Sequence, residues 1–210
     1  MRFSLFSLFA LSALLASAAA APSLQHHVLH EKRDKVPPGW SRHGQEIDGK
    51  TILPMKIGLT QGNLENADDY LMEVSHPESP KFGQHWSAKQ IAETFAPTQE
   101  TVDSVMYWLK SSGINQERVT RSQSLGWLHF DVTVEEAERL LKTKYHVYKH
   151  KGSGKLHVAC SGYHVPEYVS RHVDFVTPTV HFDSKMPMAR EEYASKIKRA
   201  PTSTAELGHP

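Results

Sequence analysis

Two apolar periodicities alternate between residues 51 and 182, and this alternation most strongly limits the folds open to the chain. Every second residue is apolar in residues 53–59 and again in 128–132, the period of a strand with one buried face. Pro54 lacks an amide hydrogen, so the first strand is expected to have a free edge near its start. The apolar positions are Leu53, Met55, Ile57 and Leu59 in the first stretch and Leu128, Phe130 and Val132 in the second.

The segments between and after these strands show the 3.6-residue period of amphipathic helices. Ser87 with Gln90 and Thr133 with Glu136 have the spacing of a capping box, which satisfies free amides in a helix's first turn. We expect each apolar stripe to face the core. The stripes are Leu64, Ala67, Leu71 and Val74 in the first helix, Val102, Val105, Met106 and Leu109 in a helix from about Thr98, and Val134, Ala137, Leu140 and Leu141 in the last.

The order of these elements predicts the fold class. Residues 118–123 form a hairpin with the strand around 128–132 through a turn at 124–126. Residues 145–150 and 156–160 add two strands joined by a turn at 151–154. The core, residues 51–182, therefore has the order strand, helices, strand, strand, helix, strand, with one extra hairpin. This order is typical of the α+β ferredoxin-like split βαβ fold, an antiparallel sheet with helices on one face.

The first twenty residues have the pattern of a signal peptide. Arg2 is followed by an uncharged stretch from Phe3 to Ala20 that ends in small residues, so cleavage is expected between Ala20 and Ala21. A signal anchor is the alternative, since this stretch nearly spans a bilayer. Its Ser- and Ala-rich end favours cleavage, and we expect a secreted, extracellular product of about 190 residues with no stable membrane anchor.

Two segments flank the core. Residues 21–50 contain prolines, glycines and charges but little apolar periodicity, which predicts an extended or loosely docked arm. Residues 183–210 have the composition of a linker or flexible tail.

The sequence contains no motif of a catalytic site. It has no G-x-S-x-G, no H-E-x-x-H and no glycine-rich phosphate loop. Cys160, the single cysteine, has no disulfide partner in the chain and alternates with the apolar residues Leu156 and Val158. It is expected to be a packed thiol rather than a nucleophile.

Neither a metal ion nor a nucleic acid is expected as a ligand. His26 and His30 are four residues apart, as are His146 and His150. Two histidines with this spacing can bind one metal ion when they lie on a helix, but the first pair falls in a predicted coil and the second in a predicted strand. A formal net charge of +1 gives no electrostatic support for nucleic acid. Aromatic and basic residues in 142–149 could suit an RNA-binding sheet, but the export signal argues against an RNA partner.

The 14 histidines of the chain predict a response to acid. Removal of Arg2 with the leader leaves 23 basic and 23 acidic side chains. Below the usual imidazole pKa of about 6.5, the exported chain moves from neutral toward roughly +14, which weakens a fixed interface. A histidine content without functional consequence is the alternative. The candidate switch residues are His76, His85, His129, His146, His150, His157, His164, His172 and His181.

Two dibasic pairs are candidate processing sites. They are Lys32–Arg33 and Lys198–Arg199, the second followed by Ala200. Polar sequence of the kind that processing proteases require flanks both pairs. The second pair separates the core from any sequence that follows it.

Four blocks of the chain resemble the activation propeptide of sedolisins, the serine-carboxyl peptidases related to kumamolisin and tripeptidyl-peptidases. The blocks are VSHPESPKFGQHWS, IAETFAPTQETVDSVMYWLKSSGI, TVEEAERLLKTKYHVYKH and YHVPEYVSRHVDFVTPTV. They occur in the family's order over about residues 36–182. The resemblance implies a domain similar to subtilisin and sedolisin propeptides, packed in cis or in trans against a sedolisin-like catalytic domain. Residues 183–210 are then a linker toward that domain.

The resemblance also implies which groups this chain lacks. Sedolisins carry their serine nucleophile, glutamate base, aspartate and calcium site in the catalytic domain, and this sequence has no S-G-T-S nucleophile segment. We therefore expect no catalytic residue, metal or cofactor in the chain. The expected function is a zymogen propeptide that inhibits an acid-active serine protease, assists its folding and is released at low pH. A free-standing secreted protease inhibitor and an independent hydrolase are the alternatives.

Overall fold

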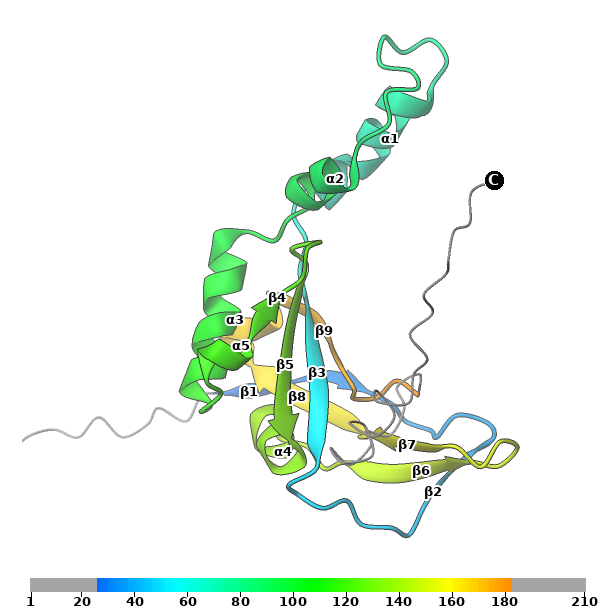
Figure 1. The fold of residues 1–210 in the computed structure, drawn as a ribbon, viewed down its shortest axis with the longest axis vertical. Helices are drawn as coiled ribbons and strands as arrows, with labels where there is room; N and C mark the ends of the chain where they lie inside the picture. Colours follow the sequence, from blue (N-terminus) through cyan, green and yellow to red (C-terminus); the bar gives the residue numbers. More distant parts are fainter. Residues whose placement is uncertain (1–25, 183–210) are drawn as a thin grey trace, which may run out of the picture.

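The chain forms a four-stranded antiparallel sheet with two helices on one face. The computed structural model describes residues 26–182. The central sheet has the order β4-β5-β3-β9, and every neighbouring pair is antiparallel (Figure 1). The strands follow one another along the chain as β3, β4, β5 and β9. In the sheet β5 lies between β3 and β4, and β9 lies beside β3, which is the predicted ferredoxin-like order. The strands are β3 (Ile52–Leu59), β4 (Thr120–Arg121), β5 (Trp127–Thr133) and β9 (Val173–Thr177).

The alternating apolar residues of β3 are buried, as the sequence predicts. Leu53, Met55, Ile57 and Leu59 are each at most 1% exposed and belong to the hydrophobic core. Full burial of such a side chain contributes roughly 1.5–3 kcal/mol. Pro54 lies where β3 pairs only with β5, since β9 pairs with β3 from Lys56 onward, so the predicted free edge is present.

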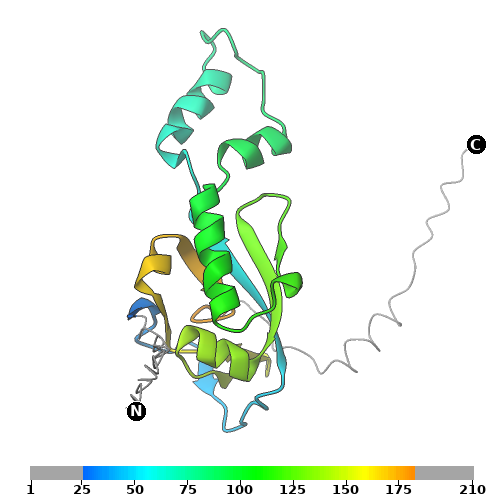
Figure 2. The same cartoon turned by 90° about the vertical axis from the view of Figure 1, so that its left-hand side faces the viewer.

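Helices α3 (Gln99–Ser111) and α4 (Val134–Leu141) cover the buried face of the sheet (Figure 2). The predicted capping box of α4 is present, because Thr133 Oγ1 accepts the Glu136 amide while the Glu136 carboxylate accepts the Thr133 amide. A cap of this kind contributes about 1 kcal/mol. The short turn η2 (Gln116–Arg118) leads from α3 to β4.

The strand that completes the sheet is not one that the sequence pattern identified. Strands β6 (His146–His150) and β7 (Leu156–Ala159) are antiparallel as predicted, but with β2 (Trp40–Arg42) they form a separate three-stranded sheet. The fourth place in the central sheet belongs to β9. Its five residues, VDFVT, are too few to show a clear period.

The segment before the core takes part in the sheets. Strand β1 (His27–Lys32) pairs with β8 (Gly162–Pro166), and β2 pairs with β6. The expected arm over residues 21–50 is therefore extended where it is described, but much of it is hydrogen-bonded to the core. The short helix α5 (Glu167–Ser170) connects β8 to β9.

A helical projection, residues 61–97, extends beyond one end of the central sheet (Figure 1). The expectation that its first helix packs on the core is wrong. Of the predicted stripe only Val74 is buried, whereas Leu64 and Leu71 are 53% and 60% exposed, because no strand of the sheet lies beneath this helix. The elements are η1 (Leu64–Asn66), α1 (Ala67–Ser75) and α2 (Ala88–Thr94).

Both ends of the chain lie outside the described residues. The predicted signal peptide with Ala20 and Ala21, and the segment 183–210, therefore stay predictions. Within residues 26–182, no helix combines the length and the apolar character needed to cross a bilayer.

Candidate functional site

The groups that could form a catalytic site are dispersed or buried. Cys160 is 1% exposed, and burial raises the pKa of its thiol to about 11, so at neutral pH it is a protonated packing group. The ring of His30 lies against Tyr163, and its Nε2 is 3.1 Å from the carbonyl oxygen of Asp174. Across residues 26–182, no three His, Cys, Asp or Glu side chains are grouped to hold a metal ion.

The most distinctive surface is the sheet face that α3 and α4 leave uncovered, here called the open face. Residues opposite each other on neighbouring antiparallel strands point to the same side. Lys56 is opposite His129, and Gly58 is opposite both Trp127 and Phe175. The open face consists of Ile52, Pro54, Lys56 and Gly58 on β3, Trp127, His129 and Asp131 on β5, and Phe175 and Thr177 on β9.

An aromatic pair lies at one end of the open face. The rings of Trp127 and Phe175 meet edge to face across Gly58, with centroids 5.1 Å apart and an interplanar angle of 85°. A Cβ atom at Gly58 would be 3.4 Å from the Phe175 ring, so glycine lets this ring lie close to the strand. Ile52 is 43% exposed at the other end of the same face. Aromatic and aliphatic side chains together with charged ones such as Lys56 are typical of a protein interface.

A second cluster, here called the exit cluster, fixes the last described residues before position 183. The ring of Phe182 stacks on His157 at 5.1 Å and meets Tyr148 edge to face at 4.8 Å. Arg33 lies over the same ring, 5.2 Å from its centroid. The exit cluster consists of Glu31, Arg33, Trp40, Tyr148, His157, His181 and Phe182.

Hydrogen bonds hold the backbone that enters the exit cluster. Arg33 Nε donates to the carbonyl oxygen of Val180 at 2.5 Å. His157 Nε2 is 2.9 Å from the carbonyl oxygen of His181, and since a carbonyl only accepts, the imidazole carries its proton on Nε2. An ion pair of 3.1 Å joins His181 to Glu31 when the imidazole is protonated. Residues 180–182 are therefore held by side chains of β1 and β7 and by Arg33, the residue after β1.

The exit cluster borders the open face. The ring centroid of His181 is 6.2 Å from that of Phe175, in an edge-to-face arrangement. A body bound on the open face would therefore meet the chain where residue 183 begins.

The two candidate processing sites differ in what the structure describes. Lys32 is the last residue of β1 and pairs with Gly162, and the Arg33 amide donates to the carbonyl oxygen of Ser161 at 2.8 Å. A protease must take its substrate as a free extended segment, so this pair is held out of reach in the folded domain. Lys198, Arg199 and Ala200 lie outside the described residues.

The candidate switch histidines do not form one site. His150, His157 and His181 lie at or beside the exit cluster, and His129 lies on the open face. His76 and His85 are exposed on the helical projection. His146 is half-buried in β6 beside Arg42, and burial followed by this guanidinium lowers its pKa.

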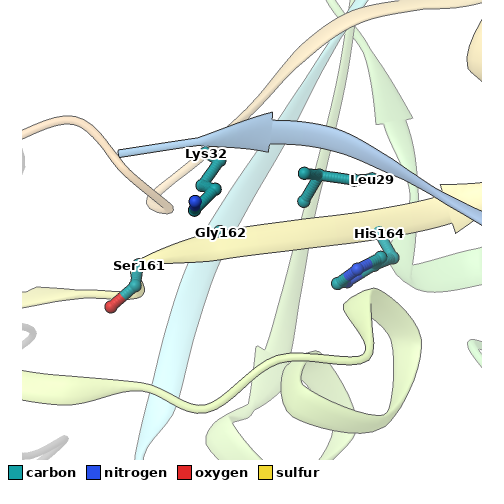
Figure 3. Close-up of a pocket in the computed structure, with 5 residues that line it drawn as sticks. All are labelled: Leu29, Lys32, Ser161, Gly162 and His164. Atoms are coloured by element: carbon teal, nitrogen blue, oxygen red, sulfur yellow. The ribbon is translucent and has the colours of Figure 1, made fainter. Parts of the chain in front are cut away.

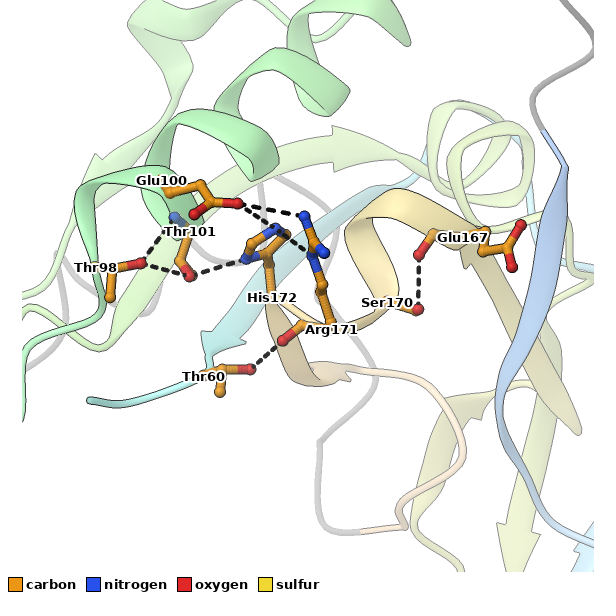
Figure 4. A network of polar contacts seen from close by, with 8 residues as sticks. All are labelled: Thr60, Thr98, Glu100, Thr101, Glu167, Ser170, Arg171 and His172. Carbon is orange, nitrogen blue, oxygen red and sulfur yellow. Dashed lines mark hydrogen bonds and ion pairs between the residues drawn. The ribbon is translucent and has the colours of Figure 1, made fainter. Parts of the chain in front are cut away.

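His172 belongs to a polar network that joins α3 to the segment before β9 (Figure 4). Its ring is buried, its Nδ1 is 2.9 Å from Thr101 Oγ1, and its Nε2 accepts the Arg171 Nε–H at 3.2 Å. Arg171 can only donate, so the neutral ring carries its proton on Nδ1. Glu100 is 3.3 Å from Arg171, which completes the link. These contacts give His172 a structural role.

His164 lines a shallow hollow of about 380 Å³ beside β1 and β8 (Figure 3). The other lining residues are Leu29, Lys32, Ser161 and Gly162. This lining contains neither a carboxylate nor a second imidazole, so it provides no acid–base pair.

These observations define a class of protein: an α+β domain with an uncovered sheet face, which holds residues 180–182 beside that face. The family model of the pro-kumamolisin activation domain matches residues 38–182. The chain belongs to this family, as the resemblance predicts.

Similar proteins agree with this assignment. The chain is 47% identical over 161 residues to tripeptidyl-peptidase sed1 of Aspergillus fumigatus, a match that covers 77% of this chain and 25% of that protein. It is 40% identical over 178 residues to aorsin of Aspergillus oryzae, covering 83% of this chain and 27% of that protein. The chain thus spans about a quarter of the length of these relatives, within their propeptide region.

Proposed function

We propose that this domain is the propeptide of a secreted, acid-active serine-type protease related to sedolisins and tripeptidyl-peptidases. In cis or in trans it would bind the catalytic domain, inhibit it and assist its folding. The observation that carries the proposal is the position of the exit cluster beside the open face, in a chain whose core matches a protease activation domain over its whole length.

Docking on the open face would bury Trp127 and Phe175 at one end of the interface and Ile52 at the other. Buried aromatic side chains commonly supply most of the binding energy. Lys56 and Asp131 would lie between the two ends and fix the orientation of the partner.

Inhibition would be carried by the residues that follow Phe182. The exit cluster would direct residues 183–210 from the edge of the interface into the substrate cleft, where they would lie until they are cut. Binding also favours the folded catalytic domain by mass action, because a propeptide that binds only the native enzyme stabilises it. One surface thereby serves both inhibition and folding.

Acid would weaken this interface through charge. His129 lies opposite Lys56, with Thr120 on its other side and Asp131 two residues along β5, so a positive charge on its ring would stand beside the Lys56 ammonium. His181 lies 3.1 Å from Glu31 at the edge of this interface, so a charge on its ring would be paired within the domain.

Inhibition measured against pH tests the proposal. Purified residues 21–210 are mixed with a mature sedolisin, such as the sed1 enzyme freed of its own propeptide, from pH 7 to pH 3.5. Strong inhibition at pH 7 that declines toward pH 3.5 is expected. Absence of inhibition at pH 7 would refute the propeptide function, and inhibition that is constant across the range would refute the acid release.

A free-standing secreted protease inhibitor is the second candidate, favoured by the self-contained core of residues 26–182. Reading the genomic frame downstream of the codon for Pro210 separates the two. An in-frame catalytic segment supports the zymogen, whereas a stop codon supports the inhibitor. Secretion is tested by amino-terminal sequencing of the exported protein, for which Ala21 is the expected first residue.

A further inference from the structure

The helical projection exposes an unusual share of apolar surface. Half of the ten large apolar side chains that are exposed in the described chain lie within its 37 residues. Apolar exposure concentrated in one short segment marks an interaction surface more often than an accident of folding. The five residues are Leu64 (53% exposed), Leu71 (60%), Met72 (53%), Phe82 (55%) and Ile91 (47%).

This exposure is not the result of a loosely folded segment. The rings of Tyr70 and Trp86 lie 5.0 Å apart, and Phe95 contacts both, so the projection has a small aromatic core of its own. The predicted capping box at Ser87 is present at the start of α2. The two ends of the projection are joined where Asn63 Nδ2 donates to the carbonyl oxygen of Thr94 at 2.7 Å. The apolar side chains are therefore held outward on a fixed frame.

The projection is also acidic. It has six carboxylates and two lysines, a formal charge of −4, and the lysines pair with Glu73 and Glu93 inside the projection. Two copies that met through the same patch would bring like charges together, which opposes a symmetric dimer through this surface. Charge complementarity instead favours a partner with lysines or arginines around an apolar centre. The carboxylates are Glu65, Asp68, Asp69, Glu73, Glu78 and Glu93.

The projection continues past one end of the central sheet and leans toward the side of the open face. In Figure 1, α3 lies to one side of β5 and β3, while α1 and the turn after it lean toward the other side. Figure 2, viewed from the side of α3, shows that helix in front of the sheet and the projection rising past its end. A large body seated on the open face would extend beneath the projection.

We propose that the helical projection is a second docking surface for the protease domain that binds the open face, contacting an apolar patch bordered by basic side chains. The inference rests on the proposed function. The size of the partner supports it, since this chain accounts for only 25% of sed1 and 27% of aorsin, and a body made from the remaining sequence is large enough to span both surfaces.

The test compares inhibition constants for a mature sedolisin at pH 7. The double variant Leu71→Ser/Met72→Ser removes two exposed apolar side chains, and its inhibition constant is expected to rise at least about tenfold. The matched control is Tyr107→Ser, since Tyr107 is 61% exposed on α3, on the helix-covered side, and no change is expected. Circular dichroism and Tm check that both variants fold like the parent.

A charge variant gives a second, independent readout. Asp68→Lys/Asp69→Lys is expected to slow association severalfold and to reduce its dependence on salt. Unchanged inhibition by the Leu71→Ser/Met72→Ser variant, with inhibition lost in a Phe175→Ala variant on the open face, would overturn the second docking surface and leave the propeptide function standing. Failure of the parent chain to inhibit would overturn both. A concentration-dependent dimer that the double variant abolishes, with inhibition intact, would show that a second copy occupies the patch and would also overturn the inference.

Discussion

Replacement of Phe175 by alanine separates the contribution of the open face to docking from its contribution to the fold. The ring is half-buried and meets Trp127 edge to face at 5.1 Å. Such a pair contributes about 0.5–1.5 kcal/mol beyond its buried area. Loss of about half of a phenylalanine's burial adds roughly 1 kcal/mol. The free energy of unfolding should therefore fall by about 2 kcal/mol, which lowers the Tm of a domain of this size by roughly 4–8 °C.

The expected effect on docking is larger than a loss of stability alone can produce. Truncation of an aromatic anchor in an interface costs about 2 kcal/mol of binding, which raises the inhibition constant about thirtyfold. The assay measures inhibition of a mature sedolisin at pH 7 and at a temperature well below both Tm values. Tyr107→Ala on α3 serves as the control. An inhibition constant within twofold of the parent, with the variant fully folded, would refute the assignment of the open face.

Three further predictions concern the domain itself. Trp108→Ala should lower the free energy of unfolding by about 3–5 kcal/mol, because Trp108 is 1% exposed in the core; a loss below about 1 kcal/mol in urea titrations would contradict this. Cys160 should resist iodoacetamide at pH 8 until the domain unfolds, since burial raises its pKa to about 11; fast labelling of the native domain would contradict this. Glu136→Gln keeps a capping side chain but loses the ion pair to Arg118, and in the parent this ion pair lowers the pKa of Glu136. The variant should therefore be less stable than the parent at pH 7, and the difference should disappear as the pH falls through that lowered pKa. A stability difference that persists in acid would contradict this prediction.

The sequence predicts those parts of the fold in which the local pattern and the tertiary packing agree. The alternation at Leu53, Met55, Ile57 and Leu59 and the capping box at Thr133 give β3 and α4 with little ambiguity. The same period misleads in the first helix, where Leu71 has the spacing of a core residue but is exposed. Periodicity shows that a face is apolar, and it does not identify what covers that face.

The docking surfaces were harder to predict because they depend on long-range pairing. Phe175 and Trp127 are 48 positions apart in the chain and meet only because β9 and β5 both flank Gly58. The exit cluster likewise joins Arg33 to Phe182 through strands whose pairing no local motif encodes. The alternation of Trp127 and His129 with apolar residues was the available signal for the open face, since it marks the uncovered side of a strand.

The central claim, that residues 21–210 form a non-catalytic domain that binds a sedolisin catalytic domain, is tested most directly by titration calorimetry at pH 7 with a mature sed1-type enzyme. The account predicts saturable binding with one domain per enzyme and a negative change in heat capacity, because apolar surface on the open face is buried. Absence of binding, or hydrolysis of peptides by the purified chain alone, would contradict it.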